Sequence, residues 1–275
     1  MNLLKKRIHW APNFIRQFGF LGGLKLLLSI ERNLPRISEK IRRYDVPGYD
    51  QPFFLRDTIA DHATFKQCMV MEQYDFRKFP QSERLLRNYR AALSRGETPL
   101  LIDCGGNVGF ATRWFARIFP EARIVVVEPN DQNFRMLTLN TEHLGDRVVR
   151  LQGGIWNTSA RLKISNPDAG AAAFRVKELD ITESEGLRAY TIKEICDMQG
   201  ALAPFIVKLD IEGAQSTLFT SNTDWVPKTQ LITLELDDWL MPWQGTSRPF
   251  FSCISHYPFE FLFRDESIFC FRDFE

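Results

Sequence analysis

The residues best suited to chemistry lie in a glycine-rich stretch, Asp103-Cys-Gly-Gly-Asn-Val-Gly109, which follows one apolar run and precedes an amphipathic segment. Glycine lets a backbone turn tightly and approach a ligand, since a Cβ would obstruct both. Nineteen residues beyond Gly109 comes Glu128, at the end of the next apolar run. In doubly wound folds a ligand lies at the carboxyl ends of the strands, where an acid accepts hydrogen bonds from ribose hydroxyls. The pattern therefore predicts a site for an adenosine-containing ligand.

The polar residues of this turn distinguish between two classes of adenosine ligand. A dinucleotide site requires Gly-x-Gly-x-x-Gly, whereas this turn is Gly-x-Asn-x-Gly with Asp103 two residues before its first glycine. A carboxylate there would repel a pyrophosphate but attract the ammonium and sulfonium groups of S-adenosylmethionine. We therefore expect S-adenosylmethionine as the cofactor. The alternative interpretation is a glycine-rich turn with a purely structural role.

A second acidic segment, Lys208-Leu-Asp-Ile-Glu-Gly213, follows a later apolar run. Parallel strands end at one edge of a sheet, so we expect Asp210 and Glu212 beside the methyl donor. Methyl transfer from a sulfonium is a direct displacement, which needs a hydroxyl held in line and a group that takes its proton. Asp210 or Glu212 is predicted to take that proton or to hold the methionine ammonium, with Lys208 keeping its partner ionised. The alternative is an ion-paired helix start, because acids stabilise helix N-termini.

Further candidates lie closer to the C-terminus. Glu235 and Asp237, at the end of another apolar run, are candidate substrate contacts. In the loop that follows, Trp239 or Trp243 is either a platform for the apolar face of a sugar or a buried core residue. His256 is an alternative general base, although a lone histidine is more often structural. No metal is predicted, because the spacing of the acids does not demand one and the chain has no CxxC pair.

Three motifs together resemble the FkbM-type S-adenosylmethionine-dependent methyltransferases: Asp-x-Gly-x-Asn-x-Gly, then Glu-Pro-Asn from residue 128, then Lys-Leu-Asp-Ile-Glu-Gly-Ala from residue 208. The resemblance covers roughly residues 100–237, and more weakly 55–56, 72–74 and 239–251. It implies a class I methyltransferase fold and O-methylation of hydroxyls on sugars, polyketides or lipids. It also implies that Glu128 binds the ribose. The cofactor loop would then be lined by Asp103, Gly105, Gly106, Asn107 and Gly109. The family commonly has Glu where this chain has Gln215, to which we assign no role.

Strands and helices are expected to alternate from Pro99 onward. Apolar runs at 100–102, 124–127, 148–151, 205–209 and 231–236 predict strands buried on both faces. Helices are predicted at 82–93, at 110–119 and from about Asp131 to Gly145. Runs at 259–263 and 268–271 flank a turn and predict an antiparallel β-hairpin, with most of the eight phenylalanines of 250–274 in the core. The predicted fold class is α/β: a doubly wound, mainly parallel, Rossmann-like sheet with a C-terminal hairpin.

Residues 1–45 form a basic, amphipathic segment for which we predict helical structure. Ten Lys or Arg against two Glu give residues 1–43 a net charge of +8; the whole chain carries +1, so the remainder carries −7. Such asymmetry indicates that one end meets an anionic surface. The segment is either a peripheral anchor on an anionic membrane or a helical cap on the catalytic domain. We predict three parts: this extension (1–45), a lead-in segment (46–98) and an S-adenosylmethionine-binding domain (99–275).

Composition limits the remaining choices. A chain with 44% hydrophobic residues is not disordered, and its charge of +1 favours a small-molecule or glycan acceptor over nucleic acid. Five widely spaced cysteines indicate reduced thiols and a cytoplasmic protein. The longest apolar stretch, Phe18 to Ile30, is shorter than a membrane span and has no cleavage site after it, so we do not expect secretion. The competing functions are a nicotinamide-dependent oxidoreductase and a non-catalytic module that retains the cofactor fold.

Overall fold

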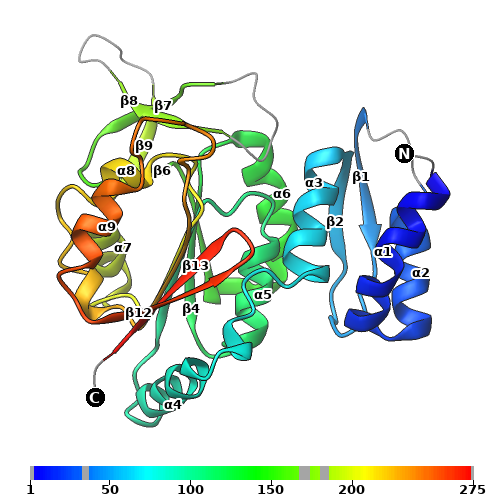
Figure 1. Cartoon of the computed structure of the whole chain (residues 1–275), viewed down its shortest axis with the longest axis horizontal. Coiled ribbons are helices and arrows are strands. Elements are labelled where there is room, and N and C mark those ends of the chain that lie inside the picture. The colour runs from blue at the N-terminus through cyan, green and yellow to red at the C-terminus, as the bar shows by residue number, and fades with distance from the viewer. Residues whose placement is uncertain (1–2, 33–36, 167–173, 180–185, 274–275) are drawn as a thin grey trace.

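The centre of the molecule is a seven-stranded sheet in the order β12-β13-β11-β10-β3-β4-β5 (Figure 1). This computed structural model describes residues 3–32, 37–166, 174–179 and 186–273. Neighbours from β11 to β5 pair in parallel, whereas β13 is antiparallel to both β11 and β12. The predicted mainly parallel sheet with a C-terminal hairpin is therefore confirmed. Its strands are β3 (Leu100–Cys104), β4 (Arg123–Glu128), β5 (Val148–Gln152), β10 (Ile206–Leu209), β11 (Leu231–Glu235), β12 (Phe259–Arg264) and β13 (Ser267–Arg272).

Helices cover both faces of this sheet because its inner strands are apolar on both sides. On β4, Ile124 and Val126 join the core beneath one set of helices, and Val125 and Val127 join the core beneath the other. Strand side chains alternate between the two faces, so an uninterrupted apolar run requires a partner on each. One set consists of α4 (Gln81–Ser94), α5 (Phe110–Ile118) and α6 (Asp131–Thr141); the other consists of α7 (Ile192–Gln199), α8 (Gln215–Leu218) and α9 (Arg248–Ile254).

The helices predicted from periodicity correspond to α4, α5 and α6, with one change of boundary. The α-helix that begins at Asp131 ends at Thr141, and the short 3-10 turn η3 (Glu142–Arg147) continues from it. Gly145 has a φ of 58°, which is incompatible with a helix, so the chain breaks there as expected. The described residues also contain a short π-helix, η1 (Lys66–Val70), and the 3-10 turns η2 (Phe76–Lys78) and η4 (Val226–Lys228).

The C-terminal hairpin extends the sheet beyond β11. Strand β13 pairs with β11, so that Glu235 lies opposite Ser267, and β12 forms the edge. The prediction that most phenylalanines from 250 to 274 are core residues is only partly correct. Four are buried (Phe250, Phe259, Phe269, Phe271), and three on the outer side of α9 and the edge strand are exposed (Phe251, Phe261, Phe263). Phe274 lies outside the described residues.

A four-stranded sheet, not predicted from the sequence, is inserted between β5 and α7. Its order is β6-β9-β7-β8, and in Figure 1 it lies above the carboxyl ends of the main strands. Its strands are only two to four residues long and are rich in charged residues, so they give no clear apolar alternation. They are β6 (Gly154–Ile155), β7 (Arg161–Ile164), β8 (Val176–Glu178) and β9 (Leu187–Tyr190).

The described residues up to Phe65 form an N-terminal lobe, which we define as α1 (Leu3–Phe18), α2 (Phe20–Ile30), β1 (Ile37–Tyr44), β2 (Phe53–Thr58) and α3 (Ile59–Phe65). The prediction of helix up to about residue 45 is wrong beyond α2, because 37–44 pair with β2 as an antiparallel strand. Helices α1 and α2 pack so closely that a Cβ on Gly23 would lie 2.3 Å from the carbonyl oxygen of Phe14. No helix among the described residues is long and apolar enough to cross a membrane.

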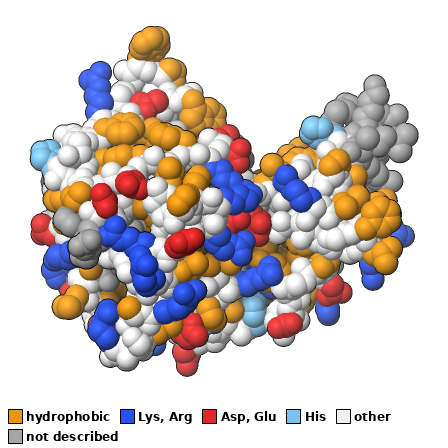
Figure 2. Space-filling model, turned by 60° about the horizontal axis from the view of Figure 1, so that its bottom comes forward, with side chains coloured by type: hydrophobic (Ala, Val, Ile, Leu, Met, Phe, Trp, Pro, Cys, Tyr) orange, Lys and Arg blue, Asp and Glu red, His pale blue; other side chains and the backbone are white. Residues whose placement is uncertain are grey.

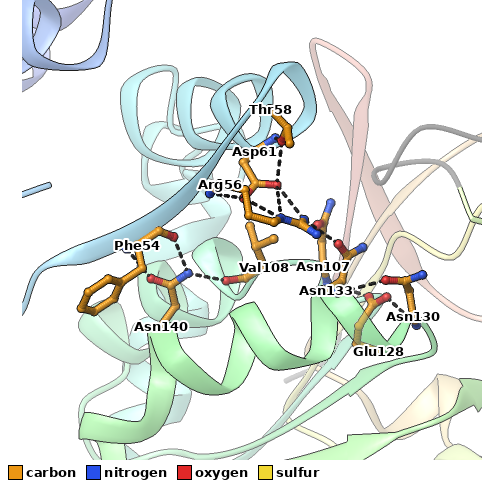
Figure 3. Close-up of polar contacts among 10 residues, drawn as sticks. All are labelled: Phe54, Arg56, Thr58, Asp61, Asn107, Val108, Glu128, Asn130, Asn133 and Asn140. Atoms are coloured by element: carbon orange, nitrogen blue, oxygen red, sulfur yellow. Dashed lines mark hydrogen bonds and ion pairs between the residues drawn. The ribbon is translucent and has the colours of Figure 1, made fainter. Parts of the chain in front are cut away.

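Hydrogen bonds from α6 attach this lobe to the main sheet (Figure 3). The Asn140 side chain, fully buried, accepts from the amide of Phe54 at 2.8 Å and donates to the carbonyls of Phe54 and Val108, each at 2.9 Å. The buried Arg56 pairs with Asp61 at 2.7 Å and donates to the side-chain oxygen of Asn133 at 2.7 Å. Strand β2 is therefore connected through α6 to the carboxyl end of β4.

Candidate cofactor and catalytic site

A cavity lies at the carboxyl ends of β3, β4 and β10. This is the position at which doubly wound sheets bind ligands, where the strand order reverses. The small sheet contributes one wall, which was not expected from the sequence. The lining consists of Gly105, Asn107, Val127, Glu128, Pro129, Asn133, Gly153, Gly154, Ile155, Phe174, Val176, Asp210, Ile211 and Glu212.

The glycine-rich turn brings the backbones of β3 and β10 together. Gly105 has a φ of 83°, and a Cβ there would lie 1.8 Å from the carbonyl oxygen of Asp210. Any side chain would therefore both strain the turn and separate the strands. Asn107, with a φ of 48°, donates its amide to Glu128 at 2.8 Å. The predicted loop and the predicted ribose acid are thus joined directly.

Glu128 ends β4 as a buried carboxylate that keeps free acceptor capacity. One oxygen accepts from the amide of Asn107, and the other accepts from the amide of Asn130 at 2.9 Å. A carboxylate has about four acceptor positions, and the Asn133 side chain occupies a third, so one remains for a ligand hydroxyl. Burial raises the pKa of Glu128 to about 7, and hydrogen bonds from the Asn130 and Asn107 amides and from Asn133 oppose that rise. Through Asn133, Glu128 is linked to Arg56 of the N-terminal lobe (Figure 3).

A buried ion cluster lies beneath the cavity. The ammonium of Lys208 is 3.0 Å from Asp103 and 3.5 Å from Asp210, and it donates to the carbonyl of Gly105 at 2.7 Å. Burial by itself lowers the pKa of Lys208, but attraction by Asp103 and Asp210 outweighs it and the pKa is raised. The predicted pairing of Lys208 with a carboxylate is present, with two partners.

Asp103 does not have the position that its predicted role in the cofactor loop requires. Its side chain is fully buried, does not line the cavity, and accepts from the hydroxyl of Thr112 at 2.6 Å while pairing with Lys208. Its charge is therefore matched inside the protein rather than offered to a ligand. Gly106 and Gly109 likewise lie outside the lining, where a Cβ on Gly106 would meet Val126. These residues shape the loop, whereas Gly105, Asn107, Glu128 and Asp210 line the cavity.

Three further acids gather at the ends of β10 and β11. Glu212, with a φ of 46°, lines the cavity, and burial together with repulsion by Asp210 and Asp237 raises its pKa to about 7. Asp237 is buried and accepts from the amide of Gly213 at 2.7 Å; burial raises its pKa to about 6. Burial, followed by repulsion from Asp210, also raises the pKa of Glu235. The described residues contain no group of His, Cys, Asp and Glu arranged to hold a metal ion.

Gln215 and Gln73 tie these acids to their surroundings. Gln215 accepts from the amide of Gly213 and donates to the carbonyl of Glu235, each at 2.9 Å, so it supports the loop after β10. The side-chain amide of Gln73 donates to the Glu235 carboxylate and to the hydroxyl of Ser267. Gln73 lies within residues 72–74 of the weaker resemblance and has no predicted role, because nothing in the sequence indicates a contact across 162 positions.

His256 and the two tryptophans are not part of this cavity. His256 is exposed, and its ring nitrogen bonds to the carbonyl of Ser252 at 2.7 Å. It comes just before β12, whose first residue pairs with Arg272, at the amino edge of the parallel strands. His256 is therefore corrected to a structural surface residue at the opposite edge from the cavity. Trp239 and Trp243 are exposed by 74% and 102%, so the alternative that they are buried core residues is wrong. A platform role for them stays a prediction.

Comparisons with known proteins concern the fold. No sequence-family model matches this chain, and no curated protein sequence matches it. Among solved structures it is similar to a methyltransferase FkbM from Methylobacillus flagellatus KT (15% identity, TM-score 0.45, covering 63% of this chain and 43% of that one) and to monomeric WbdD (14%, 0.37, 70% and 41%). It is also similar to the Methanococcus jannaschii fibrillarin pre-rRNA processing protein (8%, 0.37, 63% and 65%).

The chain spans less than half the length of the first two of these structures, and none is similar enough to bear on activity. The strand order and the antiparallel last strand by themselves place the chain in the class I, Rossmann-like methyltransferase fold class.

The raised pKa of Glu212 predicts how stability depends on pH in the absence of ligand. A folded-state pKa of about 7 against an ordinary 4.5 means that the folded state prefers the protonated form. Its contribution to stability is thus present below pH 4.5 and lost as the pH rises to about 7. We expect Glu212→Gln to raise the free energy of unfolding at about pH 8 by on the order of 1 kcal/mol, allowing for partial exposure, and to change little at about pH 4.

Urea denaturation of both proteins at the two pH values measures this effect. Glu178→Gln, which alters an exposed carboxylate on β8, is the matched control and should leave the pH dependence unchanged. If Glu212→Gln changed the free energy of unfolding equally at both pH values, the raised pKa of Glu212 would be contradicted.

Proposed function

We propose that this protein is an S-adenosylmethionine-dependent methyltransferase that transfers the methyl group to a hydroxyl of a sugar, glycan or lipid-linked acceptor. The observation that carries the proposal is the cavity in which the turn after β3 is hydrogen-bonded to the acid that ends β4. A backbone cradle that a Cβ on Gly105 would obstruct, next to a carboxylate with one acceptor position left, suits an adenosine. The partly exposed carboxylate of Asp210 supplies the negative charge that a sulfonium ligand favours.

The competing functions fit these observations less well. A dinucleotide would bring its pyrophosphate to a loop flanked by Asp210 and Glu212, both of which line the cavity. Like charges in that position repel. A non-catalytic binding module would not need an acid with a raised pKa, such as Glu212, after β10, and a perturbed carboxylate in a cavity is typical of catalytic sites.

The chain supplies orientation and a proton acceptor for this reaction. When bound, S-adenosylmethionine provides an electrophilic methyl group and keeps the electron pair of the broken carbon–sulfur bond. Glu128 would hold the ribose, and Asp210 would hold the methionine ammonium or face the acceptor. As the acceptor oxygen bonds to the methyl carbon, its proton passes to Asp210 or Glu212. Lys208, which is 3.5 Å from Asp210, keeps that carboxylate in place.

The cofactor assignment predicts micromolar binding of S-adenosylhomocysteine and no comparable binding of NAD. Glu128→Ala should weaken binding about 10- to 100-fold, because ribose hydroxyls left unpaired in a buried site cost about 1–3 kcal/mol. Isothermal titration calorimetry measures both effects. Asp131→Ala, which removes an exposed carboxylate three residues away that does not line the cavity, should bind normally. Unchanged affinity in Glu128→Ala would refute the ribose assignment.

The catalytic assignment predicts that Asp210→Asn or Glu212→Gln lowers kcat by about 10²–10⁴-fold at saturating cofactor, the usual contribution of a general base. Both changes keep the shape of the side chain and remove its charge. Turnover is measured as mass gain in a screen of glycan and lipid-linked acceptors, and it should survive a chelator. If both variants retain near-normal rates, the base lies elsewhere, and Glu235 becomes the next candidate because His256 is at the far edge of the sheet.

We also propose that the N-terminal lobe binds anionic membranes peripherally. Phe14, Leu27 and Ile30 are buried, so the lobe does pack as a cap. At the connection between its two helices, however, Phe20 and Leu21 are 65% and 80% exposed. Arg16, near the end of α1, and Lys25, on α2, are exposed basic residues of the same two helices. Figure 2 shows apolar side chains gathered on this lobe with Lys and Arg nearby. Such a surface suits the boundary between headgroups and acyl chains.

Sedimentation with vesicles tests this association. We expect binding to phosphatidylglycerol vesicles that weakens in high salt, because each basic residue contributes about 1 kcal/mol near an anionic surface. The double variant Phe20→Ser/Leu21→Ser should release the protein, whereas Leu202→Ser, at a fully exposed position elsewhere, should not. These substitutions leave β1 intact, which deletion of residues 1–45 would not. If the protein does not sediment with vesicles even at low salt, the membrane proposal is refuted and the N-terminal lobe is only a cap on the catalytic domain.

A further inference from the structure

A second cavity, of about 440 Å³, lies between the N-terminal lobe and the turn of the C-terminal hairpin. It shares no lining residue with the cofactor cavity. Its volume is in the range of small-molecule sites. The lining comes from α1, from the segment between Ile59 and Gln73, and from the hairpin turn: Trp10, Ile59, Ala63, Lys66, Gln67, Met71, Gln73, Asp265 and Glu266.

The surface of this cavity is mainly apolar, although Lys66, Gln67, Gln73, Asp265 and Glu266 also line it. Trp10, Ile59 and Met71 provide ring and aliphatic surface, and Ile59 is 71% exposed. Lys66 is buried, and its ammonium is 2.6 Å from the fully buried Glu31 and 4.7 Å from the centre of the Trp10 ring. Its charge is thus balanced within the wall. An apolar surface of this kind favours an apolar occupant.

The two sides of the cavity are held together by the hairpin. Arg264, the last residue of β12, donates to the carbonyl of Met71 at 2.7 Å and to the carbonyl of Asp75 at 2.8 Å. Ser267, the first residue of β13, accepts from Gln73 at 2.9 Å. These hydrogen bonds fix the hairpin turn against the segment around Met71, so the shape of the cavity is determined by the fold.

One wall of this cavity is also in contact with the proposed catalytic edge. Gln73 is buried and donates to the carboxylate of Glu235. Glu235 follows Leu234, which pairs with Leu209, the residue before Asp210, so Glu235 and Asp210 lie at the same edge of neighbouring strands. The Oε1 atom of Gln73 is buried without a hydrogen-bond partner among the described residues. A ligand hydroxyl would satisfy it, and unsatisfied buried polar atoms are costly.

We propose that this cavity binds the apolar body of the methyl acceptor, so that the substrate is an amphiphile: a hydroxylated head group on an alkyl or isoprenoid chain. This assignment rests on the proposed methyltransferase function and specifies its substrate class. The alkyl or isoprenoid chain of the substrate lies against Trp10, Ile59 and Met71, and its head group passes Gln73 toward Asp210. The N-terminal lobe thereby forms half of the acceptor site. Its exposed Phe20 and Leu21 allow it to meet the surface from which such a lipid would come.

Octyl glucoside below its micelle-forming concentration, compared with glucose, is the probe of this cavity. The two share sugar hydroxyls and differ in the apolar chain. Burial of two methylene groups corresponds to about tenfold in affinity, so octyl glucoside should bind at least about tenfold more tightly, as measured by saturation-transfer NMR. Ala63→Trp, which places a ring in the cavity from an exposed position on α3, should abolish this preference. Met198→Trp, on the exposed side of α7, is the matched control and should keep it.

S-Adenosylhomocysteine calorimetry on the same proteins separates the two claims. The acceptor cavity is supported if the wild type, Ala63→Trp and Met198→Trp all bind S-adenosylhomocysteine normally and only Ala63→Trp loses the preference for octyl glucoside. Equal binding of glucose and octyl glucoside by the wild-type protein overturns it and leaves the methyltransferase proposal intact. Failure of the cofactor product to bind overturns the function and with it the acceptor role. If Ala63→Trp unfolds, Ile59→Asp, a charge at an exposed position of the rim, replaces it with the same expected loss.

Discussion

The buried ion cluster around Lys208 is the interaction on which the site depends. Lys208 lies on β10, Asp103 on β3, and Asp210 immediately after β10, and the lysine also donates to the carbonyl of Gly105. Removing one partner of such a cluster costs about 3–5 kcal/mol, because it leaves a buried charge uncompensated. The cluster therefore holds the two central strands in register where the cofactor loop leaves the sheet. It also explains why Asp103, although within the motif, serves the fold rather than the ligand.

Around this cluster the protein concentrates acids that it does not neutralise. Glu128, Glu212 and Asp237 all have raised pKa values because burial disfavours their charged forms. A cationic ligand would relieve part of this penalty, so the same groups that destabilise the empty site at neutral pH favour S-adenosylmethionine over a pyrophosphate. The N-terminal lobe and the segment after it each contact an acid at this edge of the sheet. Arg56 of the lobe reaches Glu128 through Asn133, and Gln73 of the following segment donates to Glu235. A lobe that the sequence suggests is an appendage is thus connected to the site.

Local patterns were sufficient for the elements of the main sheet and for the cofactor loop. Apolar runs such as Ile124 to Val127 predict strands because two covered faces require apolar residues at every position. The tight turn at Gly105 could be predicted because such a turn requires glycine, and in the structure only a residue without a Cβ fits between β3 and Asp210. The small sheet was not predicted, since strands as short as Gly154–Ile155 are formed by their neighbours rather than by local propensity. Strand β1 was missed for a related reason, because only its pairing with β2 makes a charged segment extended.

The sequence by itself determined the fold class, the loop that follows β3, the acid that ends β4 and the acids after β10, because each depends on residue type and spacing within a short segment. Only the tertiary structure decided which of these carboxylates face the cavity and which are balanced inside the protein. It placed His256 at the amino edge of the sheet, since the last strand is antiparallel. It also brought Gln73 against Glu235, across 162 positions, and opened an apolar cavity beside them. Contacts between distant segments arise from packing of the whole chain, which no local pattern encodes.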